Sequence, residues 1–374
     1  MRILILSASY GSGHAEAARS LAAAVEARGG RAVVVDHFRE LVHPVFAHLS
    51  RAAYYWLLRR APGVWALAYG LGDRMGPESA LSFGMTRVGT TRLARLLDTM
   101  RPDAVITVHA TPAVAMAALA VRGRRLPPHT TAVTDFVAHS QWMPGPVDRY
   151  CVAAEEVRNE FVARGIPPGR VVVTGVPVRE EFARAADADS ARRALGLSPD
   201  LPTIVAMAGT QGSLGRLRDV TRALLTMARP MQAVVVAGRD ERLRAELARL
   251  AGGSSPVRVV GYVDDVRTLL AAADLLVTKA GGMTLAEATV AEVPLLLYGS
   301  LPGQERGNER FASRAGIALV ARSRGELRRL LDRAVGDPDT VERLQGSLRR
   351  LRRPDAAQHI VDLVGEQIAR HRRP

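Results

Sequence analysis

Residues 2–14 read RILILSASYGSGH, and this stretch decides the fold class. Arg2 to Ser7 is a short apolar run of the kind that forms a buried strand, and a turn rich in glycine follows at once. The segment from His14 to Arg28 is rich in alanine and has apolar positions at helical spacing, and Ala32 to Val35 is a second apolar run. A strand, a helix and a second strand in this order predict the opening of a parallel, doubly wound α/β sheet.

The same alternation of strands and helices continues along the 374 residues in two series, which is enough for two domains. In the first half we predict strands at residues 104–108, 130–135, 149–153 and 170–174. In the second half we predict strands at residues 203–207, 233–237, 257–260, 275–277 and 294–298. The predicted parts are an N-terminal Rossmann-like domain (1–178), a charged linker (179–202), a C-terminal Rossmann-like domain (203–350) and a basic helical tail (351–374). The predicted fold class is α/β, with two Rossmann-like doubly wound domains facing a cleft.

Composition excludes several classes of protein. The single cysteine, Cys151, rules out a disulfide framework within the chain. The apolar start is too short for a signal peptide. The longest mostly apolar stretch, residues 104–121, is interrupted by His109 and Pro112 and falls short of the roughly 20 apolar residues of a bilayer span. We therefore expect a cytoplasmic protein that is soluble or peripheral to the membrane.

The formal net charge of +14 attracts either nucleic acid or anionic lipid. A nucleic-acid protein needs basic residues gathered on one face with aromatic stacking platforms, whereas the arginines here are spread over both halves. The sequence therefore predicts no nucleic-acid partner. Nearly all basic residues are arginine, and Lys279 is the only lysine in the chain.

The first glycine turn, Ser9 to His14, lies between a strand and a helix. A dinucleotide fingerprint needs glycine where this chain has Glu16, and a carboxylate there repels a pyrophosphate. His14 instead opens the helix, where the helix dipole disfavours the imidazolium form, so His14 is a candidate neutral base. A histidine that merely caps the helix explains the same position equally well.

Asp135 lies in the segment Val133-Thr134-Asp135-Phe136 and is predicted to end a strand at the cleft. There it is a candidate to orient His14 or to touch an acceptor. A helix or turn cap is the alternative interpretation, at comparable weight.

The segment Thr278 to Ala288, TKAGGMTLAEA, carries the strongest signal. Gly281 and Gly282 allow a ligand close to the backbone, and the helix predicted to start at about Thr284 suits a diphosphate. Its other candidate ligand-binding side chains are Lys279, which brings a positive charge to the phosphates, and Glu287, which suits ribose hydroxyls. A capped helix with a chance lysine is the weaker alternative, because arginine serves everywhere else.

Two further loops carry weaker signals. Residues 206–213 contain Gly209 and Gln211 in a strand-to-helix turn that suits an anion, but they lack the lysine of a Walker loop. Residues 302–308 are predicted to form a loop whose Gln304, Glu305 and Asn308 are hydroxyl-binding side chains. A solvated loop is the alternative for this second segment.

Taken together, the motifs resemble the monogalactosyldiacylglycerol synthases and processive diacylglycerol glucosyltransferases. The resemblance runs from about Met1 to Leu319 and keeps motif order. It is carried by GSGH (11–14), TDF (134–136), GYVDD (261–265), KAGGMTLAE (279–287) and GQERGN (303–308). It implies a GT-B fold of family 28 type, an inverting transfer of a hexose from UDP-glucose or UDP-galactose, no cofactor and no catalytic metal.

The resemblance also implies residue roles. His14 is the candidate base on the acceptor hydroxyl. Gly281, Gly282 and Thr284 hold the diphosphate and Glu287 holds the ribose. Gln304 and Glu305 hold the hexose. The turn at Tyr262 and Val263 meets the uracil through its backbone.

The acceptor region, residues 37–100, is the part that matches the family least. It combines Trp56, Trp65 and three tyrosines with a strong arginine excess, since residues 51–101 hold eight arginines and three acids. Such a mixture suits an anionic membrane surface, and a lipid acceptor of diacylglycerol type follows from the resemblance. Core aromatics beneath a solvated arginine face are the alternative. A soluble or natural-product acceptor, and a sugar-nucleotide epimerase of the same fold, are the competing functions.

Overall fold

The computed structural model describes residues 1–8, 12–75, 89–184, 186–209, 216–253 and 256–372. The chain divides into two compact units. Unit 1 comprises Met1–Glu180, Pro302–Gln304 and Arg353–Pro374, and unit 2 comprises Glu181–Leu301 and Glu305–Arg352. The C-terminal segment, which the sequence sets apart as a tail, thus belongs to the unit of the N-terminal sheet.

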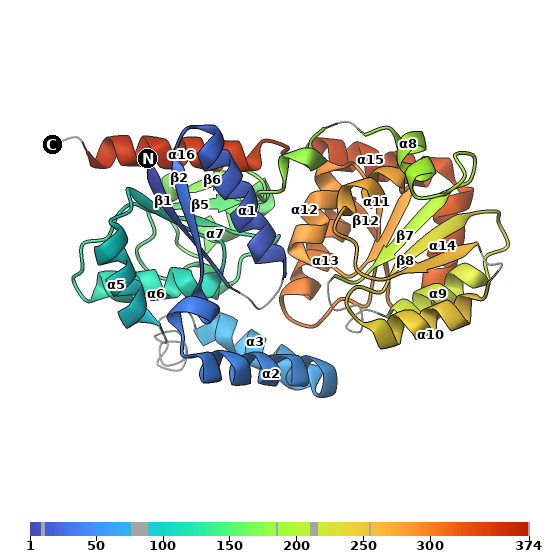
Figure 1. Ribbon diagram of the computed structural model, residues 1–374, viewed down its shortest axis with the longest axis horizontal. Helices are drawn as coiled ribbons and strands as arrows, with labels where there is room; N and C mark the ends of the chain where they lie inside the picture. Colours follow the sequence, from blue (N-terminus) through green and yellow to red (C-terminus); the bar gives the residue numbers. More distant parts are fainter. Residues whose placement is uncertain (9–11, 76–88, 185, 210–215, 254–255, 373–374) are drawn as a thin grey trace. The chain divides into compact units, whose positions relative to one another are not determined.

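Unit 1 is built on a six-stranded sheet in the order β2-β1-β3-β4-β5-β6, and every strand pair is parallel. The strands are β1 (Arg2–Ser7), β2 (Arg31–Asp36), β3 (Ala104–Thr107), β4 (His129–Ala132), β5 (Arg149–Val152) and β6 (Val171–Val173). β1 and the three strands that follow it in space are buried almost throughout, because helices cover both faces of the sheet (Figure 1).

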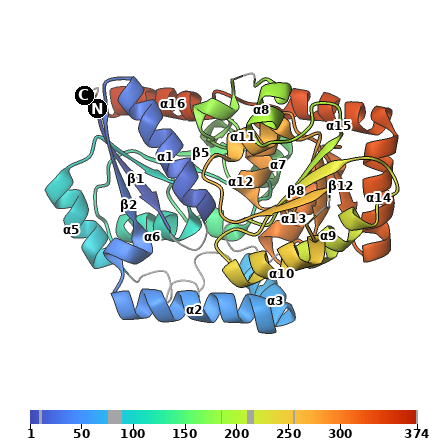
Figure 2. The same cartoon turned by 45° about the vertical axis from the view of Figure 1, so that its right-hand side comes forward.

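The described residues of unit 1 form seven α-helices. They are α1 (Ser12–Ala27), α2 (Pro44–Arg60), α3 (Pro62–Met75), α5 (Thr90–Met100), α6 (Ala110–Val121), α7 (Glu155–Ala163) and α16 (Ala356–His371). Single helical turns occupy His37–Leu41, Ser140–Trp142, Pro168–Arg170 and Glu180–Phe182. α16 crosses α1 near the C-terminal end of α1 in both ribbon views (Figure 1 and Figure 2). At this crossing the Arg28 guanidinium binds the Asp362 carboxylate.

Unit 2 has a second six-stranded parallel sheet, in the order β12-β11-β10-β7-β8-β9. The strands are β7 (Thr203–Met207), β8 (Gln232–Val236), β9 (Val257–Val260), β10 (Leu275–Thr278), β11 (Leu295–Tyr298) and β12 (Ala318–Ala321). The helices are α8 (Ala188–Ala194), α9 (Leu217–Leu225), α10 (Glu241–Ala251), α11 (Val266–Ala272), α12 (Gly282–Val290), α13 (Gln304–Arg314), α14 (Arg324–Gly336) and α15 (Pro338–Leu351). The sequence prediction missed β12, and α8 lies in the segment predicted as linker.

Three local predictions were wrong. β4 ends at Ala132, so Asp135 lies three residues beyond the strand, where its carboxylate is held by an indole instead. α12 begins at Gly282 and not at Thr284, because Gly281 already takes the N-cap position. Residues 304–308 form the first turns of α13 and not a loop, since the Glu305 carboxylate accepts a hydrogen bond from the Leu301 N–H and ties down the helix start.

Candidate active site

In unit 1, the ring of His14 is held at the first turn of α1. Its Nδ1 lies 3.0 Å from the Val108 carbonyl oxygen and 3.0 Å from the Thr134 hydroxyl. A carbonyl oxygen can only accept, so Nδ1 carries the hydrogen and Nε2 keeps its lone pair. The sequence pointed to His14 but not to the two groups that contact its Nδ1. Thr134 stood next to Asp135 in a motif already singled out, whereas a backbone carbonyl leaves no sequence signal.

Burial lowers the pKa of His14 below the ordinary value of 6.5, and this is the largest influence on the ring. The Asp135 carboxylate and the hydrogen bond to Val108 act in the opposite direction and raise that pKa. From the sequence we expected the helix dipole to keep His14 neutral, whereas in the structure the loss of solvent around the ring is the main cause of its lowered pKa. The ring is therefore neutral at pH 7 with one nitrogen able to accept a proton.

Asp135 is buried, and its Oδ2 accepts a hydrogen bond of 3.2 Å from the Trp142 indole N–H. Trp142 follows on the helical turn Ser140–Trp142, and its ring centroid lies 6.5 Å from that of His14. Asp135 lies near enough to His14 for its charge to act on the ring, and it raises the pKa of His14.

In unit 2, the turn between β10 and α12 gathers a second group of predicted residues. A methyl group placed on Gly281 would lie 3.8 Å from Lys279 Nζ and 4.0 Å from Thr284 Oγ1, so both side chains converge on this turn. Gly281 is the N-cap residue of α12 and has no side chain to fill the cap position. A glycine turn, a cation and a hydroxyl at a helix N-terminus make a site suited to phosphate oxygens.

Two neighbours hold this turn in place. The Ser300 hydroxyl accepts from the Ala280 N–H at 3.3 Å, and Asn308 Nδ2 donates to the Ala280 carbonyl at 3.1 Å. Asn308 has no exposed surface, so in this conformation it supports the turn from within. Glu287, one turn into α12, is also buried.

Lys279 and Glu305 form an ion pair with side chains 18% and 9% exposed. The other carboxylate oxygen of Glu305 accepts from the Leu301 N–H at 2.8 Å. The chain's only lysine is therefore partly neutralised by a residue that the sequence assigned to the sugar, and Gln304 precedes it at the start of α13.

The remaining predicted residues lie on other loops of unit 2. Tyr262 is 41% exposed, with the Arg239 guanidinium 4.1 Å above its ring, and Val263 follows it after β9. Gly209 follows β7 with a φ of +72°, a conformation that favours glycine. Gln211 and residues 9–11 of the first glycine turn lie outside the described residues.

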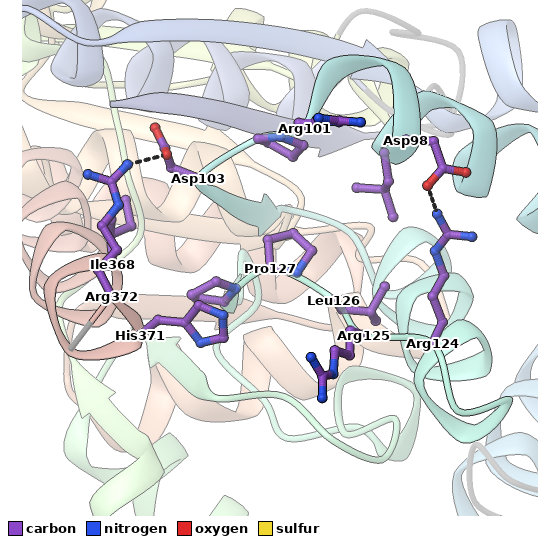
Figure 3. A pocket seen from close by; sticks show the side chains of 13 residues that line it. Asp98, Arg101, Asp103, Arg124, Arg125, Leu126, Pro127, Ile368, His371 and Arg372 are labelled. Carbon is purple, nitrogen blue, oxygen red and sulfur yellow. Dashed lines mark hydrogen bonds and ion pairs between the residues drawn. The ribbon is translucent and has the colours of Figure 1, made fainter. Parts of the chain in front are cut away.

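A separate pocket of about 380 Å³ in unit 1 lies at the amino ends of β3 and β4 (Figure 3). Its basic lining residues are Arg101, Arg124, Arg125, His371 and Arg372. Two of these arginines form ion pairs with carboxylates of the same lining, Arg124 with Asp98 and Arg372 with Asp103 (Figure 3). Ligands of doubly wound sheets bind at the carboxyl ends of the strands, and we therefore exclude this pocket as the active site.

The described residues contain no group of three or more His, Cys, Asp or Glu placed to hold a metal ion. Within the same part of the chain, no helix is both long and apolar enough to span a bilayer.

Comparison with known proteins identifies the family. Residues 14–178 match the family model of monogalactosyldiacylglycerol synthase, and residues 203–322 match that of the glycosyltransferase family 28 C-terminal domain. A processive diacylglycerol β-glucosyltransferase of Bacillus cytotoxicus is 30% identical over 98% of this chain and 94% of its own length. The chain belongs to this family of glycosyltransferases. The resemblance that the motifs predicted, and with it a hexosyltransferase, is confirmed.

Solved structures show the fold. MurG of Acinetobacter baumannii matches with a TM-score of 0.65 at 16% identity and covers 98% of this chain and all of its own. A UDP-GlcNAc 2-epimerase of Neisseria meningitidis matches with a TM-score of 0.64 at 13% identity, covering 98% of this chain and all of its own. The predicted GT-B fold is confirmed. Because an epimerase shares the fold, family membership and not architecture separates transferase from epimerase.

The ion pair of Lys279 gives a stability prediction. Lys279→Met leaves the buried Glu305 carboxylate without its cation, so we expect the free energy of unfolding in urea to fall by about 3 kcal/mol. The double variant Lys279→Met/Glu305→Met should recover most of the loss, since no charge then stays buried. Arg244→Met breaks a pair exposed on both sides and should cost less than about 1 kcal/mol. A Lys279→Met protein as stable as the wild type would contradict the assignment.

Proposed function

We propose that the protein is an inverting glycosyltransferase that moves a hexose from UDP-glucose or UDP-galactose to a lipid acceptor of diacylglycerol type at a membrane surface. Support comes from the curated relative of nearly equal length, which is named a processive diacylglycerol β-glucosyltransferase. The observation that carries the chemistry is the ring of His14, with Nδ1 bonded to a carbonyl and Nε2 left to accept a proton. The alternative, a soluble acceptor, finds no support in the names of these relatives.

The reaction is a displacement at the anomeric carbon. His14 Nε2 takes the proton of the acceptor hydroxyl, and the freed oxygen forms a bond to the anomeric carbon as the bond to the UDP oxygen breaks. The electron pair of the broken bond stays on the diphosphate. The N-terminus of α12 and the Lys279 ammonium oppose that developing charge without a metal ion.

In this proposal the donor is held by the turn between β10 and α12, the loops after β7 and β9, and the start of α13. Gly281, Gly282 and Thr284 bind the diphosphate and Glu287 binds the ribose hydroxyls. The uracil meets the backbone of Tyr262 and Val263, and the hexose meets Gln304 and Glu305. Gly209 and Gln211 contribute a second anion-binding turn. Asn308 acts through the Ala280 carbonyl that it holds.

The test is UDP release from UDP-glucose, UDP-galactose and UDP-N-acetylglucosamine on anionic vesicles with and without diacylglycerol. We expect release with one donor, dependent on diacylglycerol. His14→Ala should lower that release by about 10²–10⁴-fold while UDP affinity stays within twofold, because the base contacts the acceptor. Glu287→Ala should instead weaken UDP binding about tenfold or more, the value of one charged hydrogen bond.

Each outcome of this test separates the parts of the proposal. Release that does not depend on lipid would move the acceptor to soluble metabolites. Turnover of His14→Ala within tenfold of the wild type would remove His14 as the base. Thermal midpoints of both variants control for folding.

The charge of Asp135 predicts a shift in the pH profile. Its carboxylate stabilises the imidazolium form and raises the pKa of His14, so Asp135→Asn should lower that pKa further. The acid limb of kcat/KM for the acceptor lies below pH 6.5 in the wild type and should move to lower pH in the variant. Asparagine can still accept the Trp142 hydrogen bond, so the loop should keep its place. A limb that stays, or moves to higher pH, would exclude this role.

We propose that α2 and α3 make the membrane contact. These helices pack as a hairpin, with the Tyr54 and Trp65 ring centroids 5.1 Å apart. Their apolar side chains are exposed to an unusual degree: Val45, Phe46, Leu49, Trp56, Val64, Leu67 and Leu71 are 40–65% exposed. A cluster of this kind beside arginines is typical of a helix pair that lies in the membrane interface.

Vesicle binding tests this surface. Trp56→Ser/Leu67→Ser removes two exposed apolar groups, each worth roughly 1.5 kcal/mol when buried, so affinity for anionic vesicles should fall on the order of 100-fold. Val121→Ser is the matched control, because Val121 is 68% exposed on α6 of the same unit. Equal co-sedimentation of the double variant and the wild type would place the membrane contact elsewhere.

A further inference from the structure

His109 lies beside the base, and neither the motifs nor the family comparison assigns it a role. It follows β3 and is the N-cap residue of α6. Its ring meets that of His14 edge to face, with centroids 4.6 Å apart and planes at 87°. Trp142 is the third ring of the group, with its centroid 6.4 Å from that of His109. The two imidazoles therefore lie in contact where β1 and β3, two neighbouring strands, have ended.

A backbone hydrogen bond fixes the tautomer of His109. The Thr111 N–H donates to His109 Nδ1 at 3.0 Å, so this nitrogen carries no hydrogen and the neutral ring is protonated at Nε2. No hydrogen bond to Nε2 is formed within the described part of the chain, and the residue is only partly buried. Burial, together with the neighbouring His14 and His37, holds the pKa of His109 well below 6.5, so the ring is neutral at pH 7.

The two rings are chemically complementary. His14 offers Nε2 as a proton acceptor, because its Nδ1–H is bonded to Val108. His109 offers Nε2–H as a donor, because its Nδ1 is bonded to Thr111. An acceptor with oxygens on adjacent carbons, such as a glycerol ester or a sugar, can engage both rings at once. A simple helix cap would need only Nδ1 and would leave the rest of the ring unused.

We propose that His109 is an acceptor-binding residue whose Nε2–H donates to the acceptor oxygen next to the reacting hydroxyl, which places that hydroxyl against His14. The proposal rests on the function proposed above and specifies which atom orients the acceptor. It explains why the imidazole ring, which is larger than the usual capping side chains, occupies this cap position.

Two substitutions separate binding from capping. Asparagine retains a side-chain acceptor at the Nδ1 position but has no group at the Nε2 position. Glutamine reaches the Nε2 position with an amide N–H but loses the cap geometry. His109→Asn should therefore keep the wild-type thermal midpoint and lower kcat/KM for the lipid acceptor at least tenfold. His109→Gln should lower the midpoint and yet be at least fivefold more active on the acceptor than His109→Asn.

The KM for the UDP-sugar and the affinity for UDP should change less than twofold in both variants. His359→Asn, on the exposed face of α16, is the matched control and should behave as the wild type. A His109→Asn enzyme within threefold of wild-type kcat/KM, or a His109→Gln enzyme no better than His109→Asn, would overturn the proposal. His14→Ala distinguishes failure of this proposal from failure of the proposed base. If His14→Ala retains turnover, the assignment of His14 as the base fails. If His14→Ala loses turnover while both His109 variants keep wild-type kcat/KM, only the role of His109 fails.

Discussion

The hydrogen bond from His14 Nδ1 to the Val108 carbonyl is the constraint on which the chemistry proposed for unit 1 depends. It exists because β1 and β3 are adjacent in parallel register, with Leu6 opposite Thr107 and the Val108 N–H bonded to the Leu6 carbonyl. The helix that leaves β1 therefore begins beside the residue that follows β3. A sheet register shifted by one residue would remove the carbonyl and leave the tautomer of His14 undefined.

Unit 2 meets a different requirement in the proposed donor site, which has to present positive charge to phosphates without leaving a bare cation in a partly buried turn. The Lys279–Glu305 pair solves this, and the same carboxylate ties down the start of α13 through Leu301. In the proposed complex, the diphosphate shares Lys279 with Glu305. The glycine turn is stiffened separately through Ala280, which is bonded on both sides.

One short segment, residues 140–142, connects α3 to the surroundings of His14 through hydrogen bonds. The Asp73 carboxylate at the end of α3 accepts from the Ser140 N–H at 2.8 Å, and the Ser140 hydroxyl donates to the Gly72 carbonyl at 3.1 Å. Two residues later, Trp142 donates to Asp135, the carboxylate that raises the pKa of His14. Arg164 also binds Asp73 and completes the attachment of α3 to the sheet.

The sequence by itself determined the two doubly wound sheets, most strand positions, the glycine turn before α12 and the family. Buried parallel strands are continuous apolar runs, and phosphate-binding turns need glycine, so both leave local signals. Only the tertiary structure decided that Asp135 is held by an indole, that Glu305 pairs with Lys279 and that His109 lies against His14. The second and third depend on groups distant in sequence that strand order and helix packing bring together, and the first depends on the conformation of one loop. No local pattern encodes any of the three. The tertiary structure also decided the tautomer of His14, because its Nδ1 is bonded to the backbone carbonyl of Val108. Every residue has such a carbonyl, so the sequence gives no sign of which one is used.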